Sequence, residues 1–196
     1  IKEALNKRDI LGYSRYPLFL EVGQRRKEPD ILLLDKELGI IIIEVKGYTI
    51  DNIVGIDANE WRLEGIYAKT VNPIAQAEDY LYSLKGKFDI DRNLRNRFRG
   101  QYFVALPNIN KSQWMERGFN RIIDDTYLIF QNELSKNALI EKIKSQESLI
   151  GGTRLNNETF KIAKSILGHE NTYIDEVKGV FPEGSKCDIY NSVLNK

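Results

Sequence analysis

Two apolar runs separated by a short polar turn place the strongest constraint on how this chain folds. Residues 30–35 read DILLLD and residues 40–48 read IIIIEVKGY, with KELG between them. Apolar, β-branched runs that flank a short Gly-containing segment are typical of an antiparallel β-hairpin. With the turn centred near Glu37, Asp30 lies opposite Glu44. The same register pairs Leu32 with Ile42 and Leu34 with Ile40.

The remaining segments predict further strands and helices around this hairpin. A helix is expected to begin at Asn72-Pro73, because Asn is a favoured N-cap and Pro is favoured at the first helical position. Its apolar face would comprise Ile74, Ala77, Leu81 and Leu84, and Gly86 would end it. Other expected strands are 17–22, 60–64, 66–71, 101–106 and 126–130, and other expected helices are 2–8, 133–147 and 157–168.

This order of elements favours an α/β fold with a mixed central sheet flanked by helices. We expect a core over residues 1–132 and a helical extension over residues 133–196. The sequence leaves open whether the extension leads to a further domain. The chain has 196 residues, of which 42% are hydrophobic. That length is enough to bury a core without disulfides.

Composition excludes several classes of site. The formal net charge is +1, so a nucleic-acid surface must come from local clustering of charge. Cys187 is the single cysteine and His169 the single histidine, which rules out an internal disulfide and leaves too few ligands of this kind for zinc. We expect His169 to lie at a helix end. No run approaches the about 18 apolar residues of a membrane span, and we expect a cytoplasmic protein.

The predicted hairpin brings three ionisable side chains together. Cross-strand neighbours point to the same face of a sheet, so Asp30 and Glu44 share a face, and Lys46 shares it too. Two facing carboxylates repel each other, and a divalent cation such as Mg²⁺ or Mn²⁺ removes the conflict. Such an ion also binds a substrate phosphate and activates water, and Lys46 would either hold that water or hydroxide or neutralise the charge that develops as the phosphorane forms.

A purely structural role is the alternative for these residues. Asp30 would open a strand, and Lys46 would be the salt-bridge partner of a half-buried Glu44. An acidic residue two positions before a lysine is a short and common pattern. The two hypotheses differ in the effect of removing Asp30. At a metal site the metal-free fold would stay intact or gain stability while catalysis is lost, whereas a structural Asp30 would contribute mainly to stability.

Several short motifs, taken in order, carry a resemblance to a known family. Pro29-Asp30 followed by Glu44-Val45-Lys46 on an apolar strand resembles the PD-(D/E)XK nuclease superfamily. Further positions make the chain similar to the nuclease-related domain, NERD, over roughly residues 1–130. These are Gly39, Gly47, Trp61, Gly65, Asn72-Pro73 and Gln76-Ala77.

The resemblance implies a restriction-endonuclease-like core, Mg²⁺ dependence and DNA as substrate. Asp30 and Glu44 would be metal ligands, with the backbone carbonyl of Val45 as a further ligand, and Lys46 would be the catalytic lysine. Gln76 and Tyr80 would match a Gln-x-x-x-Tyr element of some branches. An acidic residue on the first helix would correspond to Glu3.

Gln76 and Tyr80 also have an interpretation that is independent of family. They are four residues apart, so they share a helix face near the helix N-terminus, where free backbone N–H groups favour anions. Gln76 would then bind a phosphate or orient Lys46, and Tyr80 would stack on a base. The alternative is that Tyr80 belongs to the core and Gln76 lies at its rim.

Two basic segments are candidates for contacts to a nucleic-acid backbone. Residues 85–101 hold six Lys and Arg side chains against two Asp, with Phe88 and Phe98 between them, and residues 25–27 read RRK. Clusters of this kind bind phosphates without reading sequence. A solvated surface is the alternative for both. We interpret Trp61 and Trp114 as packing residues.

The leading hypothesis is therefore a metal-dependent nuclease that hydrolyses phosphodiester bonds in DNA through Asp30, Glu44, Lys46 and Gln76. The alternative is a non-catalytic nucleic-acid-binding module linked to a helicase or ATPase, and the chain itself carries no P-loop motif. An RNA-directed enzyme of the same fold also stays open, because phosphate contacts do not distinguish RNA from DNA.

Overall fold

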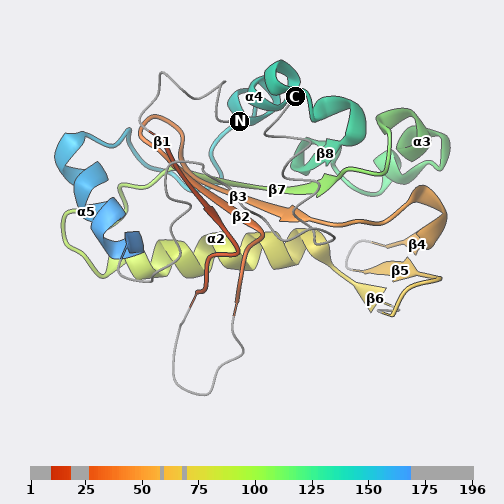
Figure 1. Ribbon diagram of the computed structural model, residues 1–196, viewed down its shortest axis with the longest axis horizontal. Helices are drawn as coiled ribbons and strands as arrows, with labels where there is room; N and C mark the ends of the chain where they lie inside the picture. The colour runs from red at the N-terminus through yellow and green to blue at the C-terminus, as the bar shows by residue number, and fades with distance from the viewer. Residues whose placement is uncertain (1–9, 19–26, 58–59, 68–69, 169–196) are drawn as a thin grey trace, which may run out of the picture.

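The computed structural model describes residues 10–18, 27–57, 60–67 and 70–168. The expected helix 2–8 with Glu3, most of the expected strand 17–22, and the residues His169 and Cys187 lie outside these ranges. Two sheets and flanking helices make up the described part, which confirms the α/β class and the mixed central sheet (Figure 1).

The central sheet has five strands in the order β1-β2-β3-β7-β8. Strands β1, β2 and β3 are antiparallel neighbours, whereas β7 and β8 run parallel to β3. The bounds are β1 Ile10–Ser14, β2 Ile31–Asp35, β3 Gly39–Val45, β7 Gly100–Leu106 and β8 Leu128–Phe130. The long central strands β3 and β7 are buried along their whole length, as expected for strands covered on both faces.

The β2–β3 hairpin has the predicted register, with Leu32 paired to Ile42. Its turn is fixed by Asp35, whose Oδ1 accepts hydrogen bonds from the backbone N–H groups of Glu37 and Leu38, both at 2.8 Å. Gly39 follows with a φ of 81° and packs so closely on the Arg99 carbonyl that a Cβ would lie 2.1 Å from that oxygen. Glycine is therefore required at this position.

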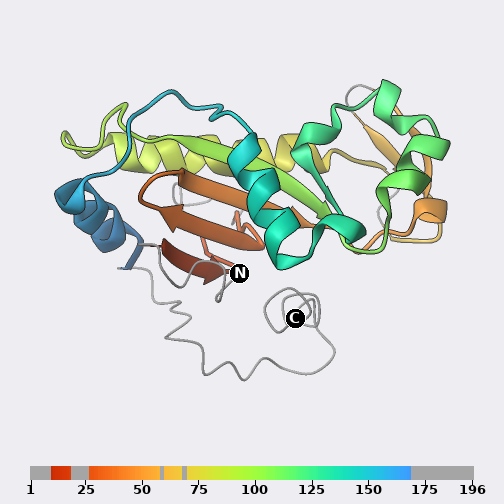
Figure 2. The same cartoon turned by 90° about the horizontal axis from the view of Figure 1, so that it is seen from above.

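Helix α2, Pro73–Asp89, covers one face of the central sheet, and helix α4, Lys136–Ser145, covers the other (Figures 1 and 2). The Asn72 side chain caps α2 by accepting from the backbone N–H of Ala75 at 2.9 Å. The prediction that Gly86 ends the helix is wrong. Burial of Phe88 two residues later outweighs the cost of a helical glycine, which is about 1 kcal/mol.

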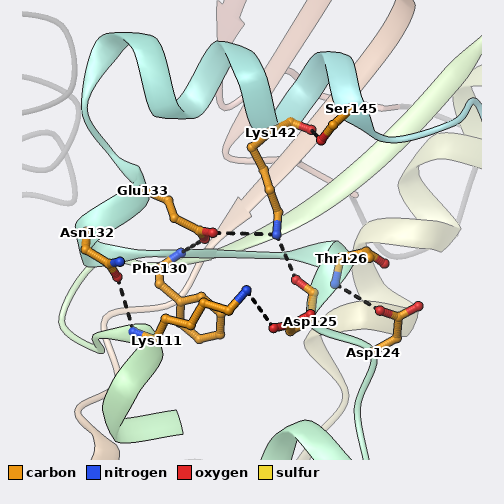
Figure 3. Close-up of polar contacts among 9 residues, drawn as sticks. All are labelled: Lys111, Asp124, Asp125, Thr126, Phe130, Asn132, Glu133, Lys142 and Ser145. Carbon is orange, nitrogen blue, oxygen red and sulfur yellow. Dashed lines mark hydrogen bonds and ion pairs between the residues drawn. The ribbon is translucent and has the colours of Figure 1, made fainter. Parts of the chain in front are cut away.

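The C-terminal helices also pack on the core. Leu139 and Ile143 of α4 are buried in the cluster beneath it, and Ala163 and Leu167 of α5, Asn157–Gly168, join the cluster on the α2 face. Lys142 of α4 lies within 3.8 Å of Glu133 Oε1 and donates to the Asp125 carbonyl at 3.0 Å (Figure 3). These contacts attach residues 133–168 to the sheet.

A second, three-stranded sheet follows the hairpin in sequence. It consists of β4 Ile53–Ile56, β5 Trp61–Leu63 and β6 Thr70–Val71. The packing interpretation of the tryptophans is confirmed, because Trp61 and Trp114 are both buried with ring centroids 5.3 Å apart. Trp114 belongs to helix α3, Lys111–Glu116, which was not predicted.

Other boundaries differ from the sequence predictions for local reasons. Strand β8 starts at Leu128, two residues later than expected, because Asp124 accepts from the Thr126 N–H at 3.0 Å and holds a turn there. Strand β1 was not predicted at all. None of the helices in the described part of the chain is long and apolar enough to cross a membrane.

Candidate functional site

The candidate site lies at the open end of the β2–β3 hairpin, opposite its turn. The hydrogen-bonded register ends at Ile31 and Ile43, and Asp30 and Glu44 are the next pair outward. Both carboxylates are buried, which costs free energy unless each group is paired. The sheet therefore places two acidic side chains in the environment least favourable to free negative charge.

Asp30 is tied to the neighbouring strand through its side chain. Its Oδ2 accepts a hydrogen bond from the backbone N–H of Val45 at 2.8 Å. In an extended strand the N–H and C=O of one residue point to the same edge, so the Val45 carbonyl is directed to the Asp30 side as well. Asp30, Glu44 and the Val45 backbone, the three oxygen donors expected for a metal, therefore lie at the same end of the hairpin.

Lys46 pairs with Glu44 and contacts helix α2. Its Nζ lies 2.8 Å from Glu44 Oε1 and donates to Gln76 Oε1 at 2.9 Å. The Lys46 backbone N–H donates to the Ala105 carbonyl at 2.9 Å, which extends the pairing of β3 with β7 by one residue. The ammonium is thereby held over the same end of the sheet as the carboxylates.

Gln76 links Lys46 to Tyr80. The Gln76 Nε2 group donates to the Tyr80 hydroxyl at 2.7 Å, which leaves Oε1 facing Lys46. The hydrogen bond between Lys46 and Gln76 therefore supports the hypothesis that Gln76 orients Lys46. The hypothesis that Tyr80 stacks on a base is wrong, because its ring is buried in the core cluster.

The electrostatics of Tyr80 reflect the same surroundings. Burial raises the pKa of Tyr80 above its usual value, and the nearby carboxylates of Glu44 and Asp30 raise it further against a lowering contribution from its hydrogen bonds. Tyr80 is therefore a neutral hydroxyl throughout the physiological range. It can accept from Gln76 without adding a charge to the site.

The donor set fits a magnesium-type ion of low protein coordination. Glu44 uses Oε1 for Lys46, while its Oε2 is buried and accepts no hydrogen bond among the described residues. Mg²⁺ takes one or two carboxylates and keeps water and phosphate oxygens as its other ligands. Within the described ranges no group of three or more His, Cys, Asp and Glu side chains could hold a metal. A bound ion would therefore depend on two carboxylates and on oxygens of other kinds.

The basic segment 85–101 lies at the far end of helix α2 from the site. Gly100 pairs with Ile40 next to the hairpin turn, about four residues of strand from Glu44, which is roughly 13 Å at ~3.3 Å per residue. Phe88 and Phe98 are fully buried and stack on each other at 4.2 Å, so they are core residues. Lys85 is ion-paired with Asp89. Arg92, Arg95 and Arg97 are exposed.

The second basic segment is described only at Lys27. Its Nζ lies 2.6 Å from Asp79 Oδ2 and donates to Ser83 Oγ at 3.1 Å, both on helix α2. Lys27 also forms an isolated antiparallel bridge with Leu18. Arg25 and Arg26 lie outside the described residues. Lys27 therefore fastens the segment that leads into Asp30 against the helix.

The model of the nuclease-related domain matches residues 1–107, slightly more than half of the chain. The chain belongs to the nuclease-related domain family. None of the curated proteins and none of the solved structures matches it. The matched range contains every residue of the candidate site and ends just after strand β7.

Proposed function

We propose that this nuclease-related domain is a metal-dependent nuclease that hydrolyses phosphodiester bonds in DNA. The observation that carries the proposal is the meeting of two buried carboxylates, Asp30 and Glu44, with the ammonium group of Lys46 at one end of the sheet. A protein that only bound nucleic acid would have no use for two adjacent carboxylates facing a polyanion.

Asp30, Glu44 and the Val45 carbonyl would hold Mg²⁺ or Mn²⁺, which supplies Lewis-acid activation of the phosphate and of a water molecule. Lys46 would donate a hydrogen bond to the phosphoryl oxygens as negative charge develops there. Gln76 keeps the ammonium aimed at the site, and Tyr80 keeps the amide of Gln76 in one orientation. Water adds to phosphorus, one P–O ester bond breaks, and a phosphate end and a hydroxyl end result.

The proposal is tested by incubating the protein with labelled single-stranded, duplex and branched DNA and with RNA, each with Mg²⁺, Mn²⁺ or EDTA. We expect cleavage of DNA with either metal and none with EDTA. Binding without cleavage under every condition would identify a non-catalytic module, the role expected beside a helicase or ATPase. Cleavage of RNA alone would reassign the substrate.

A further inference from the structure

Arg15 directly follows strand β1 and lies in line with the two carboxylates of the candidate site. The β1–β2 register ends with Ser14 opposite Ile31, and the Arg15 backbone N–H then donates to the Asp30 carbonyl at 3.0 Å. Arg15, Asp30 and Glu44 therefore form one row across the ends of three adjacent strands. The sequence pattern gave no sign of this, because strand β1 was not predicted.

The backbone of Arg15 is strained. Its φ is 51°, in the left-handed region that residues with a Cβ rarely adopt. Asn96, with a φ of 57°, is the other such non-glycine residue in the described ranges, but Asn tolerates this conformation well. For arginine it costs about 1–2 kcal/mol. Strain of this kind persists where neighbours fix the residue, and it is concentrated at functional sites.

The guanidinium of Arg15 is ion-paired through Nε, whereas its terminal Nη groups have no partner among the described residues. Its Nε lies 2.8 Å from Glu28 Oε1, and the side chain is 70% exposed compared with 21% for Glu28. The two terminal Nη groups make no hydrogen bond or ion pair within the described residues. Glu28 directly follows Lys27, which is ion-paired with Asp79 of helix α2, so the segment that carries Glu28 lies against that helix, which Lys46 also contacts through Gln76.

We propose that Arg15 binds a backbone phosphate of the substrate within a few nucleotides of the one that is cleaved, an assignment that rests on the nuclease function proposed above. A planar guanidinium grips two phosphate oxygens at once, and Glu28 fixes its orientation in advance. Two strand spacings separate Arg15 from Glu44, which is about 10 Å. At about 3.4 Å of rise per nucleotide, that distance places the bound phosphate one to three nucleotides from the scissile bond.

The competing explanation is an ordinary surface ion pair between Arg15 and Glu28. Exposed pairs of that kind contribute about 0–1 kcal/mol to stability and have no consequence for ligands. Both explanations allow Arg15→Gly to leave stability unchanged or to raise it, because glycine relieves the positive φ. They differ in binding, because the ion-pair explanation predicts that DNA affinity does not change.

The test measures affinity for a labelled 12-nucleotide DNA, single-stranded and duplex, at several salt concentrations, with Ca²⁺ in place of Mg²⁺. We expect Arg15→Gly to weaken binding about tenfold and to lower the slope of log affinity against log salt by about one, the contribution of one phosphate. Arg15→Lys should keep most of the slope and recover part of the affinity. Thermal melts should show Arg15→Gly at least as stable as the wild type.

Two control variants separate side-chain charge from backbone strain. Arg154→Gly removes an exposed arginine beside Leu155, whose N–H bonds the Lys36 carbonyl at the turn end of the hairpin. Asn96→Gly relieves the other positive φ. Both should bind DNA within about twofold of the wild type, since neither lies near the site. Wild-type affinity and salt slope in Arg15→Gly would overturn the inference while leaving the nuclease proposal intact. A wild type that neither binds nor cuts nucleic acid would overturn both.

Discussion

The Oδ2 atom of Asp30 accepts a hydrogen bond from the backbone N–H of Val45. This bond is 2.8 Å long and buried. This bond is an argument against the expectation that removing Asp30 would leave the metal-free fold intact or stabilise it, because it gives Asp30 a structural contact as well. Asp30→Ala leaves a buried N–H unpaired, which costs about 1–3 kcal/mol. Asp30→Asn keeps an accepting oxygen in the same place while it removes the charge.

We therefore predict that the two substitutions at Asp30 differ in thermal stability. In EDTA, Asp30→Ala should melt roughly 2–12 °C below the wild type, given about 2–4 °C per kcal/mol for a chain of this size. Asp30→Asn should melt close to the wild type or above it, because charge repulsion with Glu44 is relieved. Equal melting temperatures for the two variants would show that the Val45 contact contributes nothing to stability.

Metal binding should be visible without any substrate. A ligand that binds only the native state raises its melting temperature by mass action, so Mg²⁺ or Mn²⁺ should stabilise the wild type. The melting temperature of Asp30→Asn should rise less than that of the wild type when the metal is added. Asp35→Asn is the matched control, since Asp35 is also a buried carboxylate but lies at the turn of the hairpin. If the metal raises the melting temperatures of Asp30→Asn and Asp35→Asn by the same amount, the ion is not bound at Asp30 and Glu44.

The hydrogen bond from Gln76 to Tyr80 predicts a kinetic effect at a distance. Tyr80→Phe removes the acceptor for Gln76 Nε2, so the amide can rotate and release Lys46. We expect kcat to fall several-fold with little change in KM, and Gln76→Leu to lower it about 100-fold, as misplaced catalytic groups commonly do. Tyr82→Phe, an exposed position on the same helix, is the control.

The pH dependence of Tyr80→Phe should match that of the wild type in shape. Burial raises the pKa of Tyr80, so it does not ionise at the pH of an activity assay. If the activity of the wild type fell at alkaline pH and that of Tyr80→Phe did not, Tyr80 itself would exchange a proton during the reaction.

Tyr102 predicts an alkaline loss of stability. Its pKa is raised, first by burial and then by the carboxylate of Glu78, and its ring stacks on Tyr127 at 5.0 Å. A raised pKa means that the folded state favours the neutral phenol, and this stabilising contribution is lost as the pH climbs above the unfolded value of about 10. The melting temperature of Tyr102→Phe should therefore fall less steeply between pH 8 and pH 11 than that of the wild type. An equal fall in melting temperature for the two proteins would contradict this.

The exposed arginines of the basic segment 85–101 should matter only for long substrates. Arg95 and Arg97 lie roughly 13 Å or more from the carboxylates, a span of about four nucleotides at ~3.4 Å each. Their joint replacement with Ala should weaken binding of a 20-nucleotide DNA and flatten its salt dependence, but leave a three-nucleotide DNA, which is too short to reach them, unaffected. An unchanged salt slope on the long DNA would identify a solvated surface.

The sequence predicted the hairpin well because two signals agree there. The apolar runs fixed the strands and the Gly-containing turn fixed their register, so the positions of Asp30, Glu44 and Lys46 followed. Helix α2 was predicted from its cap and apolar face, although its end was set by a contact between Phe88 and Phe98 that no local pattern shows.

The features that the sequence did not predict depend on contacts between residues that are distant in sequence. Strand β1 contains Gly12 and Ser14 and has little apolar alternation, so it forms by pairing with β2. Without β1, the alignment of Arg15 with Asp30 could not be seen. The bond between Asp30 and the Val45 N–H escaped as well, because a sequence register gives facing positions and not side-chain contacts with the backbone.

The rate of DNA cleavage by the wild type and by Asp30→Asn, measured side by side with Mg²⁺ and with EDTA, tests the central claim most directly. Asp30→Asn can keep the oxygen that accepts from Val45, while it removes the charge and replaces the other carboxylate oxygen by an NH2 group that does not bind a metal. We predict Mg²⁺-dependent cleavage by the wild type, none with EDTA, and a loss of about 100-fold or more in the variant. Cleavage by Asp30→Asn at the wild-type rate, or undiminished cleavage in EDTA, would contradict the assignment of this site.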